Sequence, residues 1–291
     1  MKQFFKKHIV EILLYAVLLA GLCLLLYPSV SDWWNAMHQT RAIATYQEFV
    51  ENTTDEEQQA MLEAAREYNA RLAAGEMSFL LDEEQMAEYN KLLDPSGTGV
   101  MGYIRIPAIN VDLPIYHGVE DVVLQIGVGH IPGSSLPVGG VDTHSLLSGH
   151  RGLPSAKLFT DLNQLQVGDV FILNTLGETL TYQVDQIRIV LPEEVDELFI
   201  ARGKDYCTLI TCTPYGINTH RILVRGHRVE NLSETNLSIV SEARRSPARY
   251  VIVAIAAPML CITALAMVLI DGRKKPQKSQ QQLLEELKKS R

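Results

Sequence analysis

Residues 99–224 form a series of short β-prone runs separated by Pro and Gly, and this pattern constrains the fold more than any other feature of the chain. The runs are rich in β-branched and aromatic residues, which favour strands, whereas the Pro, Gly and Asn between them favour turns. The candidate strands cover residues 103–106, 111–115, 145–148, 170–173, 180–190, 206–211 and 222–224. Seven or eight short strands joined by polar turns predict a mainly β fold, with a closed barrel over residues 97–230.

Residues 32–96 have a different periodicity and are predicted to form a helical arm. Apolar and aromatic residues recur there every three or four positions among many Glu and Gln, as far as residue 93. A second helix within the arm is predicted over residues 82–93, because Asp82 is a suitable N-cap ahead of Glu83 and Glu84.

Two apolar segments, residues 9–27 and 250–270, are each close to the ~20 residues that cross a bilayer core. Glu11 is the single charged residue of the first segment, and the second has none. Basic residues precede the first segment and follow the second, so the positive-inside rule predicts a two-pass protein of the cell membrane with both termini in the cytoplasm. The alternatives are a cleaved signal peptide ending at the small-x-small triplet of residues 29–31 and, for the second segment, a buried core helix.

This topology divides the chain into seven parts. Residues 1–8 and the basic residues 271–291 would be cytoplasmic, residues 9–28 and 250–270 would be transmembrane helices, and residues 32–96, 97–230 and 231–249 would be an exported arm, barrel and linker. Residues 32–249 hold 30 acidic and 16 basic residues, a net charge of −14. That excess argues against nucleic acid as a partner and is compatible with a basic, lysine-presenting protein substrate.

Cys207 and Cys212 are the two cysteines of the predicted exported region. They are five residues apart on one predicted strand, so they point to opposite faces and cannot easily form a disulfide. Cys207 shares a face with Leu209 and Thr211. We therefore expect Cys207 to be a packed core thiol.

Residues 206–212 and 220–224 are two of the predicted strands, and the loop between them carries Pro214, Gly216 and Asn218. If the two strands pair antiparallel across this loop, Cys212 and Arg221 lie at the same end of one sheet. A thiolate is a strong nucleophile, and a nearby cation favours both the thiolate and an oxyanion formed on a carbonyl. The pair therefore predicts an acyl-transfer site.

An acyl-transfer site also needs a group that moves protons, and the chain has eight histidines. His150 follows an apolar run and precedes a loop, which is a common position for a working side chain. His130 and His144 are alternatives on similar grounds, and local sequence does not choose among the three. Asp142 and Asp185 could orient His150, but the sequence does not place either of them.

Several motifs in these regions resemble those of the sortase family. The sequence Thr-Leu-Ile-Thr-Cys at residues 208–212 resembles the sortase TLxTC signature, and Arg221 occupies the position of the sortase catalytic arginine. Ser-Gly-His-Arg at residues 148–151 resembles the segment that bears the catalytic histidine. Blocks at residues 99–104, 113–118, 152–159 and 213–221 resemble class C, the pilus-assembling sortases, and the resemblance runs from about residue 97 to residue 228 and extends to both apolar segments.

This resemblance implies a specific fold, activity and set of partners. The fold would be the sortase eight-stranded β-barrel, here with an N-terminal helical arm and two flanking transmembrane helices. The activity would be that of a cysteine transpeptidase without a cofactor or metal. It would cleave an LPxTG-like sorting signal on a surface or pilin protein between Thr and Gly, and would join the Thr to a pilin lysine. Cys212 would be the nucleophile that carries the thioester, His150 the general acid and base, and Arg221 the group that stabilises the oxyanion and the substrate.

Two other activities use the same residues. One is housekeeping-type attachment of surface proteins to a cell-wall precursor, and the other is a membrane-tethered cysteine protease in which water resolves the thioester. A non-catalytic pilus-docking protein is disfavoured because all three of the residues above are present. The remaining histidines lack the spacing of a metal site, and the glycines at residues 127–129 and 139–140 are predicted to form turns rather than phosphate loops.

The chain departs from class C sortases in one place. Those enzymes commonly carry a lid, a loop with an Asp-Pro-aromatic triplet whose ring covers the cysteine, but the single Asp-Pro here, Asp94-Pro95, is followed by Ser96. The interval 68–89, where a lid would lie, is short and is predicted to be helical. We therefore expect Cys212 to be openly accessible, and Phe79 is the aromatic residue inside that interval able to cover it.

Overall fold

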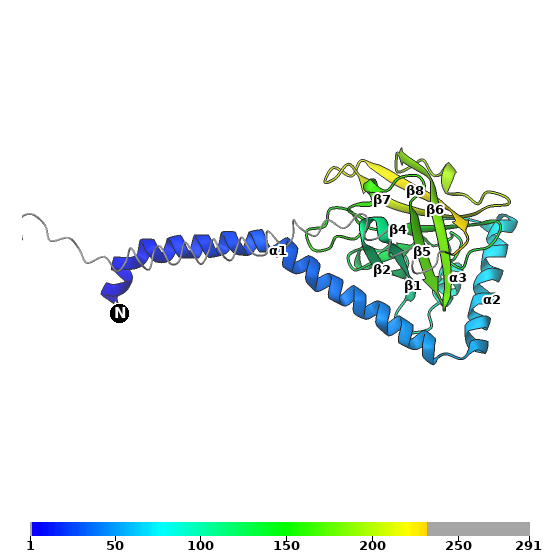
Figure 1. The fold of residues 1–291 in the computed structure, drawn as a ribbon, viewed down its shortest axis with the longest axis horizontal. Coiled ribbons are helices and arrows are strands. Elements are labelled where there is room, and N and C mark those ends of the chain that lie inside the picture. Colours follow the sequence, from blue (N-terminus) through cyan, green and yellow to red (C-terminus); the bar gives the residue numbers. More distant parts are fainter. Residues whose placement is uncertain (1, 232–291) are drawn as a thin grey trace, which may run out of the picture. The chain divides into compact units, whose positions relative to one another are not determined.

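The predicted β runs close on themselves as a barrel in the computed structural model, which describes residues 2–231 (Figure 1). The predicted linker, second membrane segment and basic tail lie outside the described residues. The strands are β1 (Val100–Ile106), β2 (Val111–His117), β3 (Val128–His130), β4 (Thr143–Ser148), β5 (Val170–Thr175), β6 (Glu178–Val190), β7 (Asp205–Thr213) and β8 (His220–Val229). Their order around the barrel is β1-β2-β3-β4-β7-β8-β6-β5, so the sheet has no open edge.

The strand β3 corrects the prediction of a turn at residues 127–129. A strand of three residues is too short to show an alternating pattern, and Gly127 before it and Gly129 within it resemble turn residues. The glycines have a packing reason instead, because a Cβ on Gly129 would lie 2.2 Å from the carbonyl oxygen of Gly118. Close approach of the segment around Gly118 therefore explains why residue 129 is a glycine. β3 pairs with both β2 and β4.

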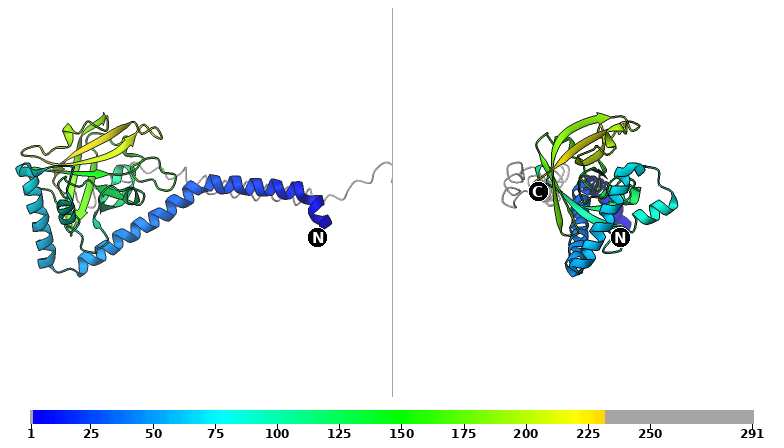
Figure 2. Two further views of the ribbon diagram at one scale, coloured as in Figure 1. Left: turned by 180° about the vertical axis from the view of Figure 1, so that it is seen from behind. Right: turned by 90° about the vertical axis from the view of Figure 1, so that its right-hand side faces the viewer.

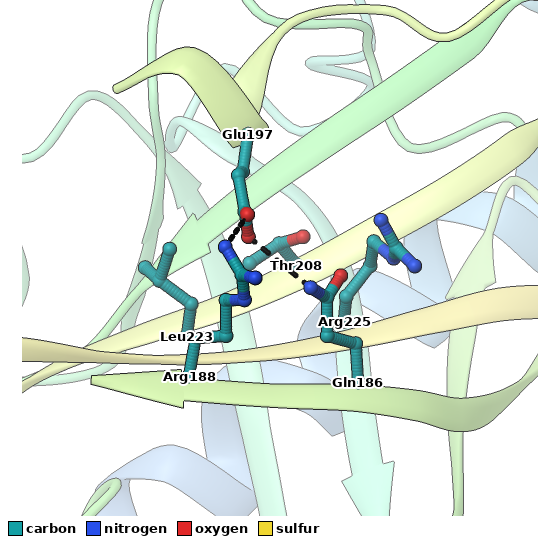
Figure 3. Close-up of a pocket in the computed structure, with 6 residues that line it drawn as sticks. All are labelled: Gln186, Arg188, Glu197, Thr208, Leu223 and Arg225. Atoms are coloured by element: carbon teal, nitrogen blue, oxygen red, sulfur yellow. Dashed lines mark hydrogen bonds and ion pairs between the residues drawn. The ribbon is translucent and has the colours of Figure 1, made fainter. Parts of the chain in front are cut away.

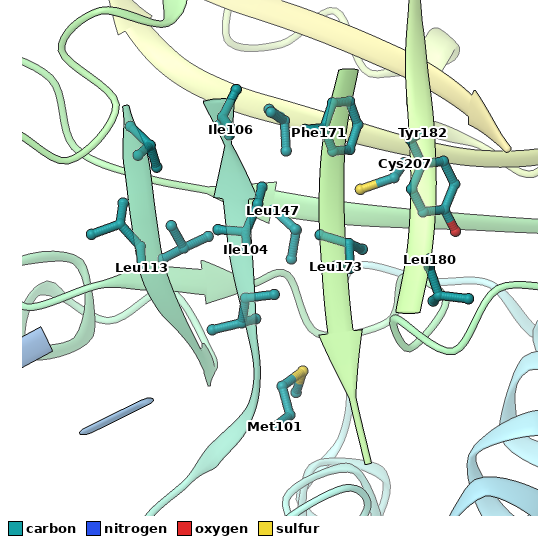
Figure 4. Packing of buried hydrophobic residues seen from close by; sticks show 14 of the residues in the cluster. Met101, Ile104, Ile106, Leu113, Leu147, Phe171, Leu173, Leu180, Tyr182 and Cys207 are labelled. Atoms are coloured by element: carbon teal, nitrogen blue, oxygen red, sulfur yellow. The ribbon is translucent and has the colours of Figure 1, made fainter. Parts of the chain in front are cut away.

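The barrel interior is filled by the inward-facing side chains of its strands, as alternation along a strand requires. Figure 4 shows this packing, in which aliphatic and aromatic side chains from several strands fill the interior and Cys207 lies near Phe171 and Tyr182. The labelled members are Met101, Ile104, Ile106, Leu113, Leu147, Phe171, Leu173, Leu180, Tyr182 and Cys207. All of them are buried, so one continuous core holds the strands in register.

The strand β7 lies between a parallel and an antiparallel neighbour, and this arrangement positions the site. β4 pairs with it in parallel, ending with Ser148 opposite Ile210. β8 pairs with it antiparallel, with Cys212 opposite Arg221. The end of β4, the end of β7 and the start of β8 therefore meet at one end of the barrel, which we call the site end.

The helical arm is present, but it is divided into separate helices. These are α1 (Lys2–Asn52), α2 (Asp55–Arg71), a π-helical turn (Leu72–Glu76) and α3 (Glu83–Tyr89). Thr54 caps α2 and Asp82 caps α3, each in a capping box with the residue three positions on, which confirms the predicted cap of the second helix. α3 ends at Tyr89 rather than at the predicted residue 93.

Residues 77–82 are not helical, so the prediction of helix throughout the interval 68–89 is wrong. Gly75 adopts a φ of 113°, which lies outside the helical region and is readily available to glycine, and the helix stops there. Met77, Phe79 and Leu81 of this segment pack onto the barrel instead of onto a neighbouring helix.

A stripe along α1 faces the barrel, and its members recur every three or four residues. They are Asp32, Asn35, Gln39, Ile43, Tyr46 and Val50. The hydroxyl of Tyr46 donates to the carbonyl of Met101 (3.1 Å) and accepts from the backbone N–H of Leu176 (2.8 Å), which ties the helix to β1 and to the β5–β6 turn. Figure 2 shows from behind how the second half of α1 and then α2 run alongside the barrel.

The N-terminal half of α1 contains the predicted first membrane segment. The helix from Ala16 to Asn52 includes an 18-residue window with a mean hydropathy of 1.6, and none of that window is buried inside the structure. By length and composition this helix could cross a membrane, as a membrane anchor or as a signal sequence.

Four short elements complete the site end and the outer face of the barrel. α4 (Asp121–Leu124) lies between β2 and β3, and a 3₁₀ turn (Leu162–Gln164) follows the loop after β4. A second 3₁₀ turn (Asp196–Leu198) lies in the β6–β7 connection, and a third (Pro107–Ile109) joins β1 to β2.

Candidate active site

Cys212 and Arg221 are direct cross-strand partners at the end of the β7–β8 hairpin. This confirms the antiparallel pairing predicted from the sequence. Leu209 and Thr211 are buried, whereas Cys212 is partly exposed on the outer face of the barrel, as alternation along β7 requires. Because directly opposite residues share a face, the thiol and the guanidinium both project to this outer side.

The guanidinium of Arg221 is held by its own turn. Nη1 donates to the carbonyl oxygens of Asn218 (3.2 Å) and His220 (3.1 Å). These two bonds use one of the guanidinium nitrogens, and Arg carries five N–H donors in a fixed fork. The cation is therefore fixed beside Cys212 with further donors available for an oxyanion or a carbonyl.

His150 lies next to Cys212 because the loop after β4 continues to follow β7. The backbone N–H of Gly149 donates to the carbonyl of Ile210 (3.0 Å), and the hydroxyl of Thr211 donates to the carbonyl of Gly149 (2.7 Å). The parallel register of β4 and β7, extended by two residues, sets His150 beside Cys212. The structure thus brings the three predicted site residues to one end of the barrel.

The residue after His150 is also tied to β7. Nη1 of Arg151 donates to the hydroxyl of Thr213 at 2.9 Å. The backbone bonds of Gly149 and the side-chain bond of Arg151 therefore hold the segment around His150 against the strand that carries Cys212, while the side chain of His150 stays partly exposed.

A carboxylate that sequence reasoning missed lies against His150. Oδ1 of Asp121, at the start of α4, is 3.5 Å from Nε2 of His150. The two predicted candidates are engaged elsewhere: Asp142 accepts from the backbone N–H of Gly203, and Asp185 pairs with Arg225 through two contacts. Asp121 comes from a different part of the chain, and no motif in the sequence indicates it.

His130 is a structural residue of the core. It is fully buried, one ring nitrogen meets the hydroxyl of Tyr89 (2.9 Å), and the other meets the carbonyl of Ser135 (2.9 Å). Burial lowers the pKa of His130 to about 4. This histidine is neutral near pH 7 and fastens α3 to the barrel, so it is not part of the site.

His144 has a similar role on the other side of β4. Its Nδ1 lies 3.0 Å from the carbonyl of Phe199 and its Nε2 lies 2.7 Å from the hydroxyl of Thr208. Burial lowers its pKa to about 4 as well. Of the three histidines left open by the sequence, His150 alone lies beside Cys212, since the other two are held in the protein interior.

Cys207 is the core thiol that its position predicted. It is fully buried among the side chains shown in Figure 4, and burial raises its pKa well above the usual range. A thiol that stays protonated and inaccessible does not act as a nucleophile. Among the cysteines of residues 2–231, Cys212 is the partly exposed one on the barrel, and Cys23 lies on α1.

The outer face that carries Cys212 continues into an apolar cluster. The buried members are Leu146, Leu198, Ile210 and Leu223. Phe79, from the non-helical segment 77–82, packs against this cluster, and its ring centroid lies 5.5 Å from that of Phe199. The segment lies close to β3, because a Cβ on Gly133 would meet the carbonyl oxygen of Ser78. Phe79 therefore covers the face two residues along β7 from the thiol, and Cys212 keeps partial exposure.

A polar pocket follows the cluster along the same strands (Figure 3). Glu197, from the 3₁₀ turn Asp196–Leu198, pairs with Arg188 and accepts from Nε2 of Gln186 at 3.3 Å. These contacts attach the β6–β7 connection to the outer face of β6. Residues 2–231 contain no cluster of three side chains able to hold a metal ion.

Comparisons with known proteins agree with this geometry. Residues 104–229 match the family model of the sortase domain. The chain is 34% identical to Sortase A of Streptococcus agalactiae serotype III (strain NEM316) over 128 residues, which are 43% of this chain and 51% of that protein, so it spans about half the length of that relative. It is 30% identical to Sortase D of Bacillus subtilis (strain 168) over 167 residues, 55% of this chain and 81% of that protein.

The solved structures that resemble this chain are also sortases. The crystal structure of sortase C1 from Streptococcus agalactiae is 52% identical, with a TM-score of 0.65 over 66% of this chain and 100% of that one. Clostridium perfringens sortase C, solved with the C-terminal cell wall sorting motif, is 44% identical, with a TM-score of 0.58 over 66% of this chain and 100% of that one.

The fold and the site define a cysteine enzyme built on a closed β-barrel. The chain belongs to the sortase family, whose members are cysteine transpeptidases, and its structural neighbours include class C sortases.

Proposed function

We propose that this protein is a membrane-anchored transpeptidase that cleaves an LPxTG-like sorting signal between Thr and Gly and joins the Thr to a pilin lysine. The observation that carries the proposal is the cross-strand pairing of Cys212 with Arg221, with His150 on the adjoining loop. The 52% identity to a sortase C1 supports the pilin as the acceptor-bearing partner.

In the first half of the reaction, Sγ of Cys212 attacks the carbonyl carbon of the Thr. The negative charge that develops on the carbonyl oxygen is stabilised by N–H donors of Arg221, which its turn already holds in place. The C–N bond to Gly breaks, and His150 gives a proton to the departing amine. The product is a thioester between Cys212 and the Thr.

In the second half, the amine of a lysine attacks the thioester carbonyl. His150 accepts a proton from that amine, the C–S bond breaks, and the thiolate of Cys212 is regenerated. With Nε2 turned toward Asp121, Nδ1 is the ring nitrogen that exchanges these protons. Asp121 would thus act as a positioning residue for the imidazole.

Anchoring is part of the proposal. The apolar helix α1 would span the membrane, residues 250–270 would form a second span, and both termini would be cytoplasmic. Reporter fusions test this topology. A fusion at Arg291 should give a cytoplasmic signal and a fusion in the β6–β7 connection an external one, and an external signal from Arg291 would contradict the two-pass arrangement.

The activity is tested with the purified full chain in detergent and an LPxTG peptide. The proposal predicts a thioester on Cys212 and, when a lysine-bearing pilin fragment is added, a peptide joined to that lysine. Three acceptors are compared: the pilin fragment, an amine that mimics the cell-wall precursor, and water. Ligation that prefers the precursor amine would indicate housekeeping attachment, and hydrolysis indifferent to amines would indicate a cysteine protease.

A further inference from the structure

α1 contacts the barrel in a fixed direction, and this direction decides which end of the barrel faces the apolar segment. Oδ1 of Asp32 accepts from the backbone N–H of Lys157 (2.8 Å), and Nδ2 of Asn35 donates to the carbonyl of Ser155 (2.6 Å). Both partners belong to the loop after β4, which is at the site end. Further along the helix, Tyr46 reaches the β5–β6 turn at the opposite end of the barrel. The site end is therefore the end next to the apolar half of α1.

The distance from that apolar half to the site end is short. The apolar run of α1 after Glu11 ends at Tyr27, and a helix rises 1.5 Å per residue, so Asp32 and Asn35 lie about 8 and about 12 Å further along. The headgroup region of one leaflet is on the order of 5–8 Å thick. Trp33 and Trp34 between them are exposed, as is typical of aromatic residues at a membrane interface. A bilayer around α1 would therefore reach the loops of the site end.

Three loops form the rim around Cys212, and contacts join them to one another. The first is residues 119–127, attached to α1 where Nε2 of Gln39 donates to the carbonyl of Ile126 (3.1 Å). The second is residues 149–161, attached to α1 by the bonds described above. The third is residues 214–219, whose Tyr215 ring packs over Gly152 of the second loop. We call these three loops the rim.

The rim exposes several large apolar side chains to solvent. Val122, Ile126, Tyr215 and Ile217 are 73%, 45%, 61% and 68% exposed, and they come from the first and third loops. Large exposed apolar side chains on two loops that both adjoin the loop 149–161 favour contact with another apolar phase. The continuity of the rim with α1 makes the bilayer the occupant, because these loops lie beside the helix that enters it.

We propose that the rim rests on the membrane surface, with Val122, Ile126 and Ile217 in the interfacial layer. The catalytic thiol of Cys212 then faces the bilayer rather than the aqueous side. The inference rests on the proposed function in one respect, namely that α1 is a membrane anchor. A sorting signal that leaves the membrane would then meet Cys212 without having to extend outward past the barrel.

Single-tryptophan quenching by brominated lipids tests this placement in the full chain. Trp33 and Trp34, the two tryptophans of the protein, are replaced by Phe, and one Trp is introduced by Val122→Trp, by Ile217→Trp or, as the control, by Val141→Trp. Val141 is as exposed as Val122 (73%) but precedes β4, at the opposite end of the barrel. In vesicles of phosphatidylcholine brominated on the acyl chains, we expect loss of emission at positions 122 and 217 and none at position 141.

The unsubstituted chain provides the reference for anchoring, since its Trp33 and Trp34 should be quenched whenever α1 is inserted. Quenching of that chain without quenching at 122 and 217 would overturn the inference, as would equal quenching at all three positions. Emission at 122 and 217 that changes with the protein-to-lipid ratio but not with bromination would assign the rim to a second copy instead. Peptide ligation in detergent does not enter these measurements, so failure of the proposed activity and failure of this inference are separate results.

Discussion

Cys207 and Cys212 lie on the same strand and differ in the face on which they lie, in burial and in their neighbours. Cys207 points into the barrel, is fully buried and has a raised pKa. Cys212 points outward, is partly exposed and lies opposite Arg221. The difference arises from the odd spacing of the two residues on β7, because successive side chains of a strand alternate between faces. The barrel wall thus separates the buried thiol of Cys207 from the accessible thiol of Cys212.

The histidines are divided by burial in the same way, although His144 lies on the outer face beneath Phe199 of the β6–β7 connection. His130 and His144 are buried, hydrogen-bonded and neutral near pH 7, whereas His150 is partly exposed on the loop beside Cys212. Buried groups in this protein fasten elements together, and the groups able to do chemistry lie on the outer face at the site end.

The strongest test of this comparison replaces each cysteine in turn. Cys212→Ala should abolish the thioester with an LPxTG peptide, because no other thiol on the barrel is accessible among the described residues. Cys207→Ala should keep the activity, since the buried sulfur only fills space. Intact-mass spectrometry of the acyl-enzyme measures both, and an inactive but folded Cys207→Ala variant would reverse the assignment.

The next test concerns the outer-face partners. Arg221→Ala and His150→Ala should each lower kcat/KM by ~10²-fold or more, the scale for loss of an oxyanion donor or an acid–base group. Arg225→Ala is the matched control, because Arg225 projects from the same face of β8 but pairs with Asp185. Peptide cleavage rates measure the effect, and equal losses for Arg221 and Arg225 would show that neither arginine acts at the thiol.

The buried histidines make a prediction about stability and pH. Their pKa is about 4 in the folded chain and about 6.5 when unfolded, so between these values the unfolded chain binds protons that the folded chain does not. The free energy of unfolding is therefore highest above pH 6.5 and falls as the pH drops toward 4, by about 3 kcal/mol for each histidine over the whole window.

Chemical unfolding of the full chain in detergent at several pH values measures this slope. His130→Gln should make the pH dependence shallower, although the variant is less stable overall. His38→Gln is the control, since His38 is exposed on α1, and it should leave the slope unchanged. An unchanged slope in His130→Gln would mean that His130 binds protons equally in the folded and unfolded chains, which would contradict its lowered pKa.

The smallest effect is expected at Phe79. The sequence predicted that Cys212 is openly accessible, and the structure adds that Phe79 covers the apolar cluster further along β7. Phe79→Ala should leave the rate of labelling of Cys212 by a small thiol reagent unchanged and lower the KM for the peptide a few-fold, because the segment no longer occupies part of the face. Faster labelling in Phe79→Ala would show that the ring shields the thiol after all.

Much of the barrel could be predicted because its strands alternate or are β-branched throughout, and the Cys212–Arg221 pair followed from one hairpin. β3 was missed because Gly129 allows close packing rather than a turn. This role is evident only from the contact with Gly118, a residue of the preceding loop. The helix break after Gly75 was missed because Met77, Phe79 and Leu81 are partly buried against the barrel, a long-range contact that the local sequence does not show.

The parts of the site that the sequence did not determine depend on contacts between distant elements. Burial, which separates His150 from His130 and His144, is a property of the folded chain and leaves no local signal. Asp121 reaches His150 from α4, and nothing around it resembles a motif. Long-range proximity of this kind becomes visible only when β4 and β7 are paired.

The stripe on α1 also sets how the enzyme and its anchor can vary together. Since an α-helix turns by about 100° and advances 1.5 Å for each residue, one residue inserted between Tyr27 and Asp32 would swing the apolar half around the helix axis while Asn35 and Tyr46 stayed on the barrel. The helix therefore fixes the rotation of its apolar half relative to the barrel, which a flexible linker would not do. Changes in the length of this arm should be tolerated in whole turns and not in single residues, so the rotational phase of the helix, more than its length, is what the arm specifies.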